Sequence, residues 1–242
     1  MNLSISAKNR LIFALDVPNR KEAESYVRAL GDTVGCFKVG LELFIKEGPD
    51  VLKTVKQNSS ASIFLDLKLH DIPATVRSAL RSAATHGVRF ITVHASDGGS
   101  ILQTANEVKD LGLEVLAVTV LTNVSESELG GLGYKENLSL RQLVLDRANV
   151  AKESGCAGVV CSGEEVALIK RTCSNHFKVV VPGIRPLWAD VKKDDQSRIV
   201  TPKDAISNGA DLIVVGRPIR DAKDPNRAAL KIVEEIESAL SA

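Results

Sequence analysis

The sequence has little of what marks most specialised classes of protein. Of its 242 residues only 4% are aromatic, and 31 basic residues against 30 acidic ones leave a formal net charge of +1. Because there is no basic excess to attract phosphate backbones, we expect no nucleic-acid partner. No apolar run approaches the roughly 18–20 residues that cross a bilayer, so we expect no membrane association.

The cysteines and the amino-terminal segment favour a cytoplasmic protein. The chain has only four cysteines, Cys36, Cys156, Cys161 and Cys173. They are too few and too irregularly spaced for a disulfide framework or a zinc site, which predicts buried, reduced thiols. Met1–Arg10 lacks the apolar core of a signal peptide.

What the sequence does contain is a regular series of short apolar segments. They are rich in Val, Ile, Leu and Phe and hardly alternate with polar residues, which is typical of parallel strands covered on both faces. The eight segments are Leu11–Val17, Cys36–Gly40, Ser62–Leu67, Phe90–Ala95, Val115–Val120, Gly158–Cys161, Lys178–Val181 and Leu212–Gly216. Composition does not shift between them and no Pro-, Gly- or Ser-rich linker interrupts them, so we expect one catalytic domain over residues 1–242.

Amphipathic segments with helix signals lie between these strands. Asn19 precedes Arg20–Leu30, a proline opens the stretch before Val76–Thr85, and Thr201-Pro202 opens Lys203–Asn208. Eight βα units of about 30 residues each predict an α/β fold of the (β/α)8 TIM-barrel type. A doubly wound open sheet is the alternative, but its usual Gly-rich turn is missing after the first strand.

Charged residues stand near the carboxyl ends of the first three strands. Asp16 lies at the end of the first strand, Lys38 lies in the second, and Asp66 and Lys68 end the third. We expect the four to converge, because this end of a barrel carries the active site. Asp66 and Lys68 are two residues apart and should point to the same side of their strand. Unpaired buried charges are costly, so an alternating set indicates a functional site in which each charge lies between opposite ones.

Five motifs carry a resemblance to a known family. The third strand continues into Asp66-x-Lys68-x-x-Asp71-Ile-Pro-x-Thr75, which is similar to the signature of the orotidine 5′-monophosphate decarboxylase family. The others are Leu15-Asp16-Val17-Pro18, Phe37-Lys38-Val39-Gly40, Val181-Pro182-Gly183-Ile184-Arg185 and Val215-Gly216-Arg217-Pro218-Ile219. The Asp-x-Lys-x-x-Asp portion alone is shared with other barrel decarboxylases and aldolases that act on sugar phosphates.

The resemblance implies decarboxylation of orotidine monophosphate to UMP in de novo pyrimidine biosynthesis, without a metal or other cofactor. Lys68 would stabilise the carbanion left at C6 of the pyrimidine and then protonate it. Asp66 would face the substrate carboxylate and hold Lys68, while Lys38 and Asp16 would contact the ribose hydroxyls. Lys38 also completes the set of catalytic charges.

The resemblance also implies a homodimer with shared active sites. In the family, the residues that correspond to Asp71, Ile72 and Thr75 reach into the neighbouring subunit's site, with the aspartate counted among the catalytic residues. From the residues alone, Asp71 could equally serve as the cap of the following helix.

The remaining substrate contacts lie in the second half of the chain. Barrels commonly bind phosphate at the loops after strands seven and eight, which here carry Arg185 and the Gly216-Arg217 pair. Arg217 can contact a phosphate in bidentate fashion. By resemblance, Gln196 is a further phosphate-side residue, the loop Thr122–Ser139 is a lid over the pyrimidine, and Thr122 and Pro182 are substrate contacts.

Two other functions remain open. One is a keto-sugar phosphate decarboxylase that uses the same Asp-x-Lys-x-x-Asp frame with Mg²⁺, although Glu42 is the one extra carboxylate near strand two. The other is a protein that binds a nucleotide phosphate without turnover, for which four buried charges would be unnecessary. We expect His70 and His94 to have structural roles, because the family assigns proton transfer to Lys68.

Overall fold

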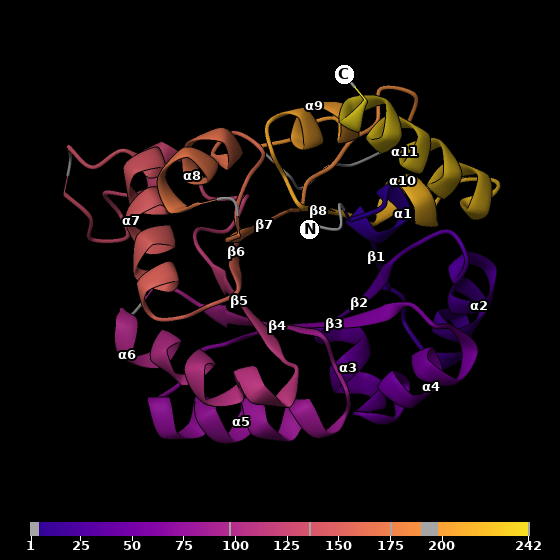
Figure 1. Ribbon diagram of the computed structural model, residues 1–242, viewed down its shortest axis with the longest axis horizontal. Helices are drawn as coiled ribbons and strands as arrows, with labels where there is room; N and C mark the ends of the chain where they lie inside the picture. The colour runs from indigo at the N-terminus through magenta and orange to yellow at the C-terminus, as the bar shows by residue number, and fades with distance from the viewer. Residues whose placement is uncertain (1–4, 97, 136, 175, 190–197, 242) are drawn as a thin grey trace.

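The structure is a closed barrel of eight parallel strands, paired in the order of the chain with β8 returning to β1 (Figure 1). This computed structural model describes residues 5–96, 98–135, 137–174, 176–189 and 198–241. The strands are β1 (Leu11–Ala14), β2 (Cys36–Gly40), β3 (Ser62–Leu69), β4 (Phe90–His94), β5 (Glu114–Val118), β6 (Gly158–Val160), β7 (Lys178–Val181) and β8 (Leu212–Val215). The barrel confirms the predicted fold class and excludes the open sheet.

The predicted strands all exist, but several of their ends differ. β1 stops at Ala14 rather than Val17, although the amide of Leu15 still donates to the carbonyl of Lys38 at 2.9 Å. β3 runs two residues further than predicted, to Leu69. β8 ends at Val215 rather than Gly216, and Arg217 begins a short helix. Apolar composition alone does not mark the residue at which a strand ends.

Helices surround the barrel, as Figure 1 shows. Those in the first half are α1 (Ala7–Arg10), α2 (Arg20–Leu30), α3 (Leu41–Glu47), α4 (Asp50–Asn58), α5 (Pro73–Thr85), α6 (Gly99–Leu102) and the 3₁₀ segment η1 (Gln103–Leu111). Those in the second half are η2 (Glu126–Glu128), α7 (Leu140–Glu153), α8 (Val166–Cys173), α9 (Pro202–Ser207), α10 (Arg217–Arg220) and α11 (Pro225–Leu240). The three helices predicted from sequence are α2, α5 and α9. In α2 and α9, Asn19 and Thr201 accept hydrogen bonds from the first turn.

Apolar side chains form two layers. A small cluster fills the barrel interior, where the rings of Phe64 and Phe90 meet edge to face with centroids 6.1 Å apart. A larger cluster packs the outer face of the strands against the helices. All four cysteines are buried and unpaired, as predicted. In the part of the chain that is described, no helix is both long and apolar enough to cross a membrane.

Candidate active site

A cavity of about 500 Å³ opens at the carboxyl ends of the strands. The side chains that fill the barrel interior are apolar, and the polar side chains lie at the open end of the barrel, around the cavity. Nine of the residues predicted from sequence line the cavity: Asp16, Lys38, Asp66, Lys68, Thr122, Pro182, Arg185, Gly216 and Arg217. The structure therefore brings most of the predicted site together.

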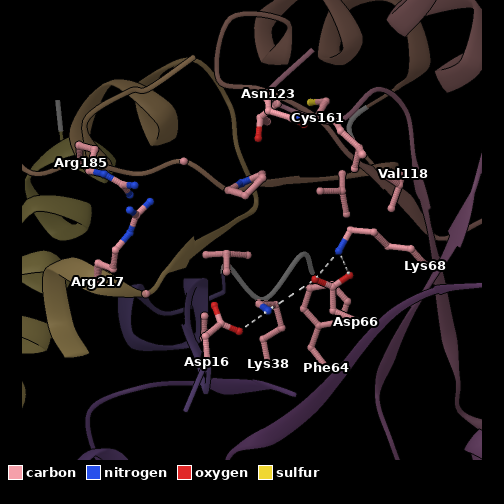
Figure 2. Close-up of a pocket in the computed structure, with 18 of the residues that line it drawn as sticks. Asp16, Lys38, Phe64, Asp66, Lys68, Val118, Asn123, Cys161, Arg185 and Arg217 are labelled. Carbon is pink, nitrogen blue, oxygen red and sulfur yellow. Dashed lines mark hydrogen bonds and ion pairs between the residues drawn. The ribbon is translucent and has the colours of Figure 1, made fainter. Parts of the chain in front are cut away.

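Four of these residues form a continuous row of alternating charges, which we call the charge array: Asp16, Lys38, Asp66 and Lys68. The ammonium of Lys68 donates to both oxygens of Asp66, at 2.9 and 3.0 Å. Lys38 Nζ lies 3.6 Å from Asp66 Oδ2 and 3.0 Å from Asp16 Oδ1 (Figure 2). The convergence predicted from the strand ends is confirmed.

Burial and pairing act in opposite directions on the two central groups. Burial alone would raise the pKa of Asp66, but the ammonium groups of Lys38 and Lys68 outweigh it and hold that pKa below its usual value. Burial alone would lower the pKa of Lys38, but the carboxylates of Asp16 and Asp66 outweigh it and raise that pKa. Both groups are therefore ionised near neutral pH, although their side chains are only 12–13% exposed.

The backbone at Lys68 is irregular. Its φ of 49° lies in the left-handed region, and the pairing of β3 with β4 shifts register between Leu65 and Leu69. Thr92 on β4 stabilises this bulge, because its hydroxyl accepts from the amide of Lys68 at 2.8 Å and donates to Asp66 Oδ1 at 2.9 Å. Asp66 and Lys68 thus meet as predicted, but across a bulge rather than along a regular strand.

Gly40 leaves room for the ion pair between Lys38 and Asp16. A Cβ at this position would lie 3.0 Å from Lys38 Nζ and 3.2 Å from Asp16 Oδ1. Any side chain there would press on the pair directly, which gives the glycine of the Phe37-Lys38-Val39-Gly40 motif a physical reason.

The arginines stand across the cavity from the charge array. Figure 2 shows the guanidinium groups of Arg185 and Arg217 on the opposite side from Lys68 and Asp66. Arg217 is the first residue of α10 and follows Gly216 directly. Cationic groups at one end and an ammonium–carboxylate pair at the other suit an elongated anionic ligand. Gln196, the other predicted phosphate-side residue, lies outside the described residues.

The three residues predicted to serve a partner subunit lie elsewhere. Asp71, Ile72 and Thr75 are exposed and do not line the cavity of their own chain. The alternative prediction, that Asp71 is the N-cap residue of the following helix, is wrong. The cap of α5 is Ile72, and the carboxylate of Asp71 accepts a 2.6 Å hydrogen bond from the amide of Ile72, ahead of the helix.

Several residues at the cavity were not predicted. Thr92 does not line the cavity, but its hydroxyl contacts both Asp66 and Lys68, and a threonine within an apolar strand gives no sequence signal for this role. Asn123, Phe64 and Arg220 line the cavity. Arg220 donates to the backbone carbonyl of Asp16 at 2.9 Å and so fixes the chain that carries this carboxylate.

Outside the charge array, the side chains that could act as a nucleophile, acid or base are those of Cys161, His70 and His94. Cys161 lines the cavity, but burial first and the nearby Glu165 second raise its pKa well above the usual value, so it is a neutral thiol. His94 Nδ1 lies 3.0 Å from Ser96 Oγ, and its ring stacks on that of His70 with centroids 5.6 Å apart. Neither histidine lines the cavity.

The described residues contain no group of three or more His, Cys, Asp or Glu side chains placed to hold a metal ion. Glu42, the carboxylate required by a magnesium-dependent alternative, lies on α3 and does not line the cavity. The side chains of the cavity can stabilise negative charge: the Lys68 ammonium is fixed by Asp66 on one side, and the guanidinium groups of Arg185 and Arg217 lie on the other.

A closed (β/α)8 barrel with lysines and aspartates alternating at its mouth has the architecture of a barrel enzyme. The sequence model of the family described as "Orotidine 5′-phosphate decarboxylase / HUMPS family" matches residues 9–232. The chain belongs to this family.

Relatives of nearly the same length are similar to this chain in sequence and in fold. Orotidine 5′-phosphate decarboxylase of Desulfosudis oleivorans is 48% identical over 242 residues, which cover 98% of this chain and 96% of that protein. The crystal structure of orotidine 5′-phosphate decarboxylase from Lactobacillus acidophilus has a TM-score of 0.81 at 38% identity, and covers 93% of this chain and 98% of that one. The corresponding enzyme from Pyrococcus horikoshii OT3 has a TM-score of 0.74 at 29% identity, with 94% and 99% covered.

Proposed function

We propose that this chain, acting as one catalytic domain over residues 1–242, converts orotidine 5′-monophosphate to UMP and CO₂ in de novo pyrimidine biosynthesis. The observation that carries the proposal is the ammonium of Lys68, which lines the cavity and donates to both oxygens of Asp66. The names of the curated relatives supply the substrate.

The reaction needs a cation beside the carbon that loses CO₂. When the bond from C6 to the carboxylate breaks, its electron pair stays on C6 in an orbital that the ring cannot delocalise. Lys68 stabilises this charge and then transfers an N–H proton to C6, which completes the replacement of CO₂ by hydrogen. A pair of hydrogen bonds to Asp66 fixes the position of the ammonium, so little reorganisation is required during the step.

Asp66 has a second effect in this proposal. Two carboxylates about 4 Å apart repel by roughly 4 kcal/mol at an effective dielectric constant near 20. The substrate carboxylate beside Asp66 would lose this repulsion on leaving as CO₂. Lys38 and Asp16 would bind the ribose hydroxyls, and their 3.0 Å ion pair sets the position of both.

The phosphate end of the substrate would occupy the side of the cavity that carries Arg185 and Arg217. The backbone amides of Gly216 and Arg217 would lie beside the Arg217 guanidinium as further donors, and Gln196 would add a side-chain contact. Thr122 and Pro182 would contact the pyrimidine, with the loop over residues 122–139 as the lid. Binding energy from the phosphate would then hold the base against Lys68.

We further propose a cytoplasmic homodimer in which Asp71, Ile72 and Thr75 enter the site of the partner. Support comes from their position: they follow the strand that carries Lys68, yet they are exposed and do not line their own cavity. Ile72 is 66% exposed, so its apolar side chain is available for contact with a partner.

The experiment that tests the function follows pyrimidine absorbance after protein is added to orotidine monophosphate, with and without excess chelator. We expect many turnovers per protein molecule and the same rate in chelator. Loss of the rate in chelator would favour the magnesium-dependent reaction. Absence of turnover, with UMP still bound, would favour a protein that only binds nucleotides.

A further inference from the structure

An ion pair between Glu165 and Arg198 lies behind the wall of the cavity. Glu165 precedes α8 and is 3% exposed, and Arg198 is 9% exposed. Arg198 Nη1 donates to Glu165 Oε1, and Arg198 Nη2 lies 3.4 Å from the carbonyl oxygen of Leu121. The pair is close to Cys161, the cavity residue at the end of β6, because both charges act on that thiol.

The pair connects three loops of the barrel mouth. Glu165 belongs to the loop after β6, and Leu121 is a cavity residue in the loop after β5, next to Thr122. Arg198 belongs to the loop after β7, where Val200 pairs with Ile184 and its carbonyl accepts from the amide of Arg185 at 2.9 Å. Only Ile199 therefore separates Arg198 from Val200, whose carbonyl fixes the backbone of Arg185.

As a source of stability the pair is poor. Among the described residues, Glu165 Oε2 and Arg198 Nε are buried without a hydrogen-bond partner. Buried ion pairs with incomplete hydrogen bonding contribute little to stability and are often replaced by apolar residues at no loss. Burial also raises the pKa of Glu165 despite the neighbouring Arg198 guanidinium, so the pairing does not offset the cost of burying this carboxylate. A role in positioning accounts for such a pair better than a role in folding.

We propose that Glu165 and Arg198 are positioning residues that hold the loops after β5 and β7 against the end of β6. The pair thereby keeps Thr122 and Arg185 facing one substrate from two sides. This inference rests on the proposed function, in which Thr122 contacts the pyrimidine and Arg185 the phosphate. Neither member of the pair lines the cavity, and neither contacts Lys68, which is carried by β3.

Two single variants and one double variant test the proposal. Arg198→Lys keeps a charge but cannot reach both Glu165 and Leu121, and Glu165→Gln keeps the shape but loses the charge. We expect each to reduce kcat/KM for orotidine monophosphate by roughly 10- to 100-fold. Most of the loss should appear as a higher KM and weaker UMP binding in calorimetry, with kcat changed less, because the Lys68–Asp66 pair is untouched.

The double variant Glu165→Leu with Arg198→Met separates positioning from stability. Apolar replacement of the pair should return Tm to the wild-type value or above it. If the pair positions the loops, KM and UMP affinity should stay impaired although Tm has recovered. If KM and UMP affinity recover together with Tm, the pair serves folding alone and the proposal is overturned.

A matched control is Lys170→Met, which breaks the 2.6 Å ion pair with Asp211 at the other end of the barrel. It should lower Tm while leaving KM, kcat and UMP affinity at wild-type values. If this control shifts KM as much as Arg198→Lys does, the effect is general destabilisation and the proposal fails. If wild-type protein neither turns over orotidine monophosphate nor binds UMP, the proposed function fails first.

Discussion

The ammonium of Lys68 donates hydrogen bonds to both carboxylate oxygens of Asp66. The backbone of Lys68 has a φ of 49°, in the left-handed region that residues other than glycine seldom adopt. Residues held in such a conformation cost of order 1–3 kcal/mol and are found where the surrounding structure requires them. Here the requirement comes from Thr92, which binds the amide of Lys68 and the carboxylate of Asp66 with one hydroxyl.

The cost of this conformation can be measured. Lys68→Gly and Lys68→Ala both remove the ammonium, but only glycine adopts a positive φ freely. We expect Lys68→Gly to be more stable than Lys68→Ala by about 1 kcal/mol in urea unfolding at pH 7. Ser78, exposed within α5, is a matched control at which the alanine variant should be the more stable of the two. Equal stability of the two Lys68 variants would show that the bulge stores no strain.

The charge array should make stability depend on pH. The lowered pKa of Asp66 means that its contribution is complete above its ordinary value of 3.8 and is lost as pH falls through the folded value. At pH 7 Asp66→Asn should cost about 3–5 kcal/mol, because it leaves Lys38 and Lys68 without their shared partner. In urea titrations between pH 7 and pH 3 the gap between variant and wild type should narrow in the acid range. If the difference in unfolding free energy between Asp66→Asn and wild type stayed constant over this pH range, the pairing of Asp66 with the two lysines would be contradicted.

The same reasoning applies on the alkaline side. The raised pKa of Lys38 means that its contribution is present below its ordinary value of 10.5 and is lost only as pH rises through the higher folded value.

The phosphate end can be tested through Arg217. A charge-assisted hydrogen bond contributes about 1.5–3 kcal/mol, so Arg217→Ala should reduce kcat/KM for orotidine monophosphate by roughly 10- to 100-fold. Orotidine, which lacks the phosphate, should be a very poor substrate of the wild type. Arg227, exposed on α11, is the control whose alanine variant should retain full activity. Comparable wild-type rates on orotidine and its monophosphate would refute the assigned role.

Subunit mixing tests whether Asp71 serves the neighbouring site. Asp71→Asn and Lys68→Ala homodimers should each be nearly inactive. In a mixed dimer one site carries both lesions, while the other combines intact Lys68 and intact Asp71 from different chains. Random exchange of equal amounts should therefore restore roughly a quarter of wild-type activity. A mixture shown by a tag to have exchanged subunits, yet no more active than its parents, would place Asp71 in its own subunit's site.

The sequence predicts the barrel because its signal is repeated. Continuous apolar strands such as Phe90–His94 and capped helices such as Arg20–Leu30 recur along the whole chain, and each repeat supports the others. The site is predictable for a related reason: charges such as Asp66 and Lys68 interrupt apolar strands and stand out against them.

The features of the site that the sequence did not predict depend on contacts between residues far apart in the chain. No glycine or turn residue marks the bulge at Lys68, which exists because Thr92, 24 residues away, binds its amide. The Glu165–Arg198 pair joins residues 33 apart in loops whose positions follow only from barrel closure.

The most direct measurement of the central claim, that Lys68 does the chemistry, compares Lys68→Ala with wild type in turnover and in UMP binding. Lys68 acts on charge that appears mainly in the transition state, so turnover should vanish while UMP affinity, carried by the phosphate and ribose contacts, stays close to wild type. Circular dichroism should confirm that the barrel is intact. A folded Lys68→Ala variant that retained more than a few per cent of wild-type turnover would contradict the account.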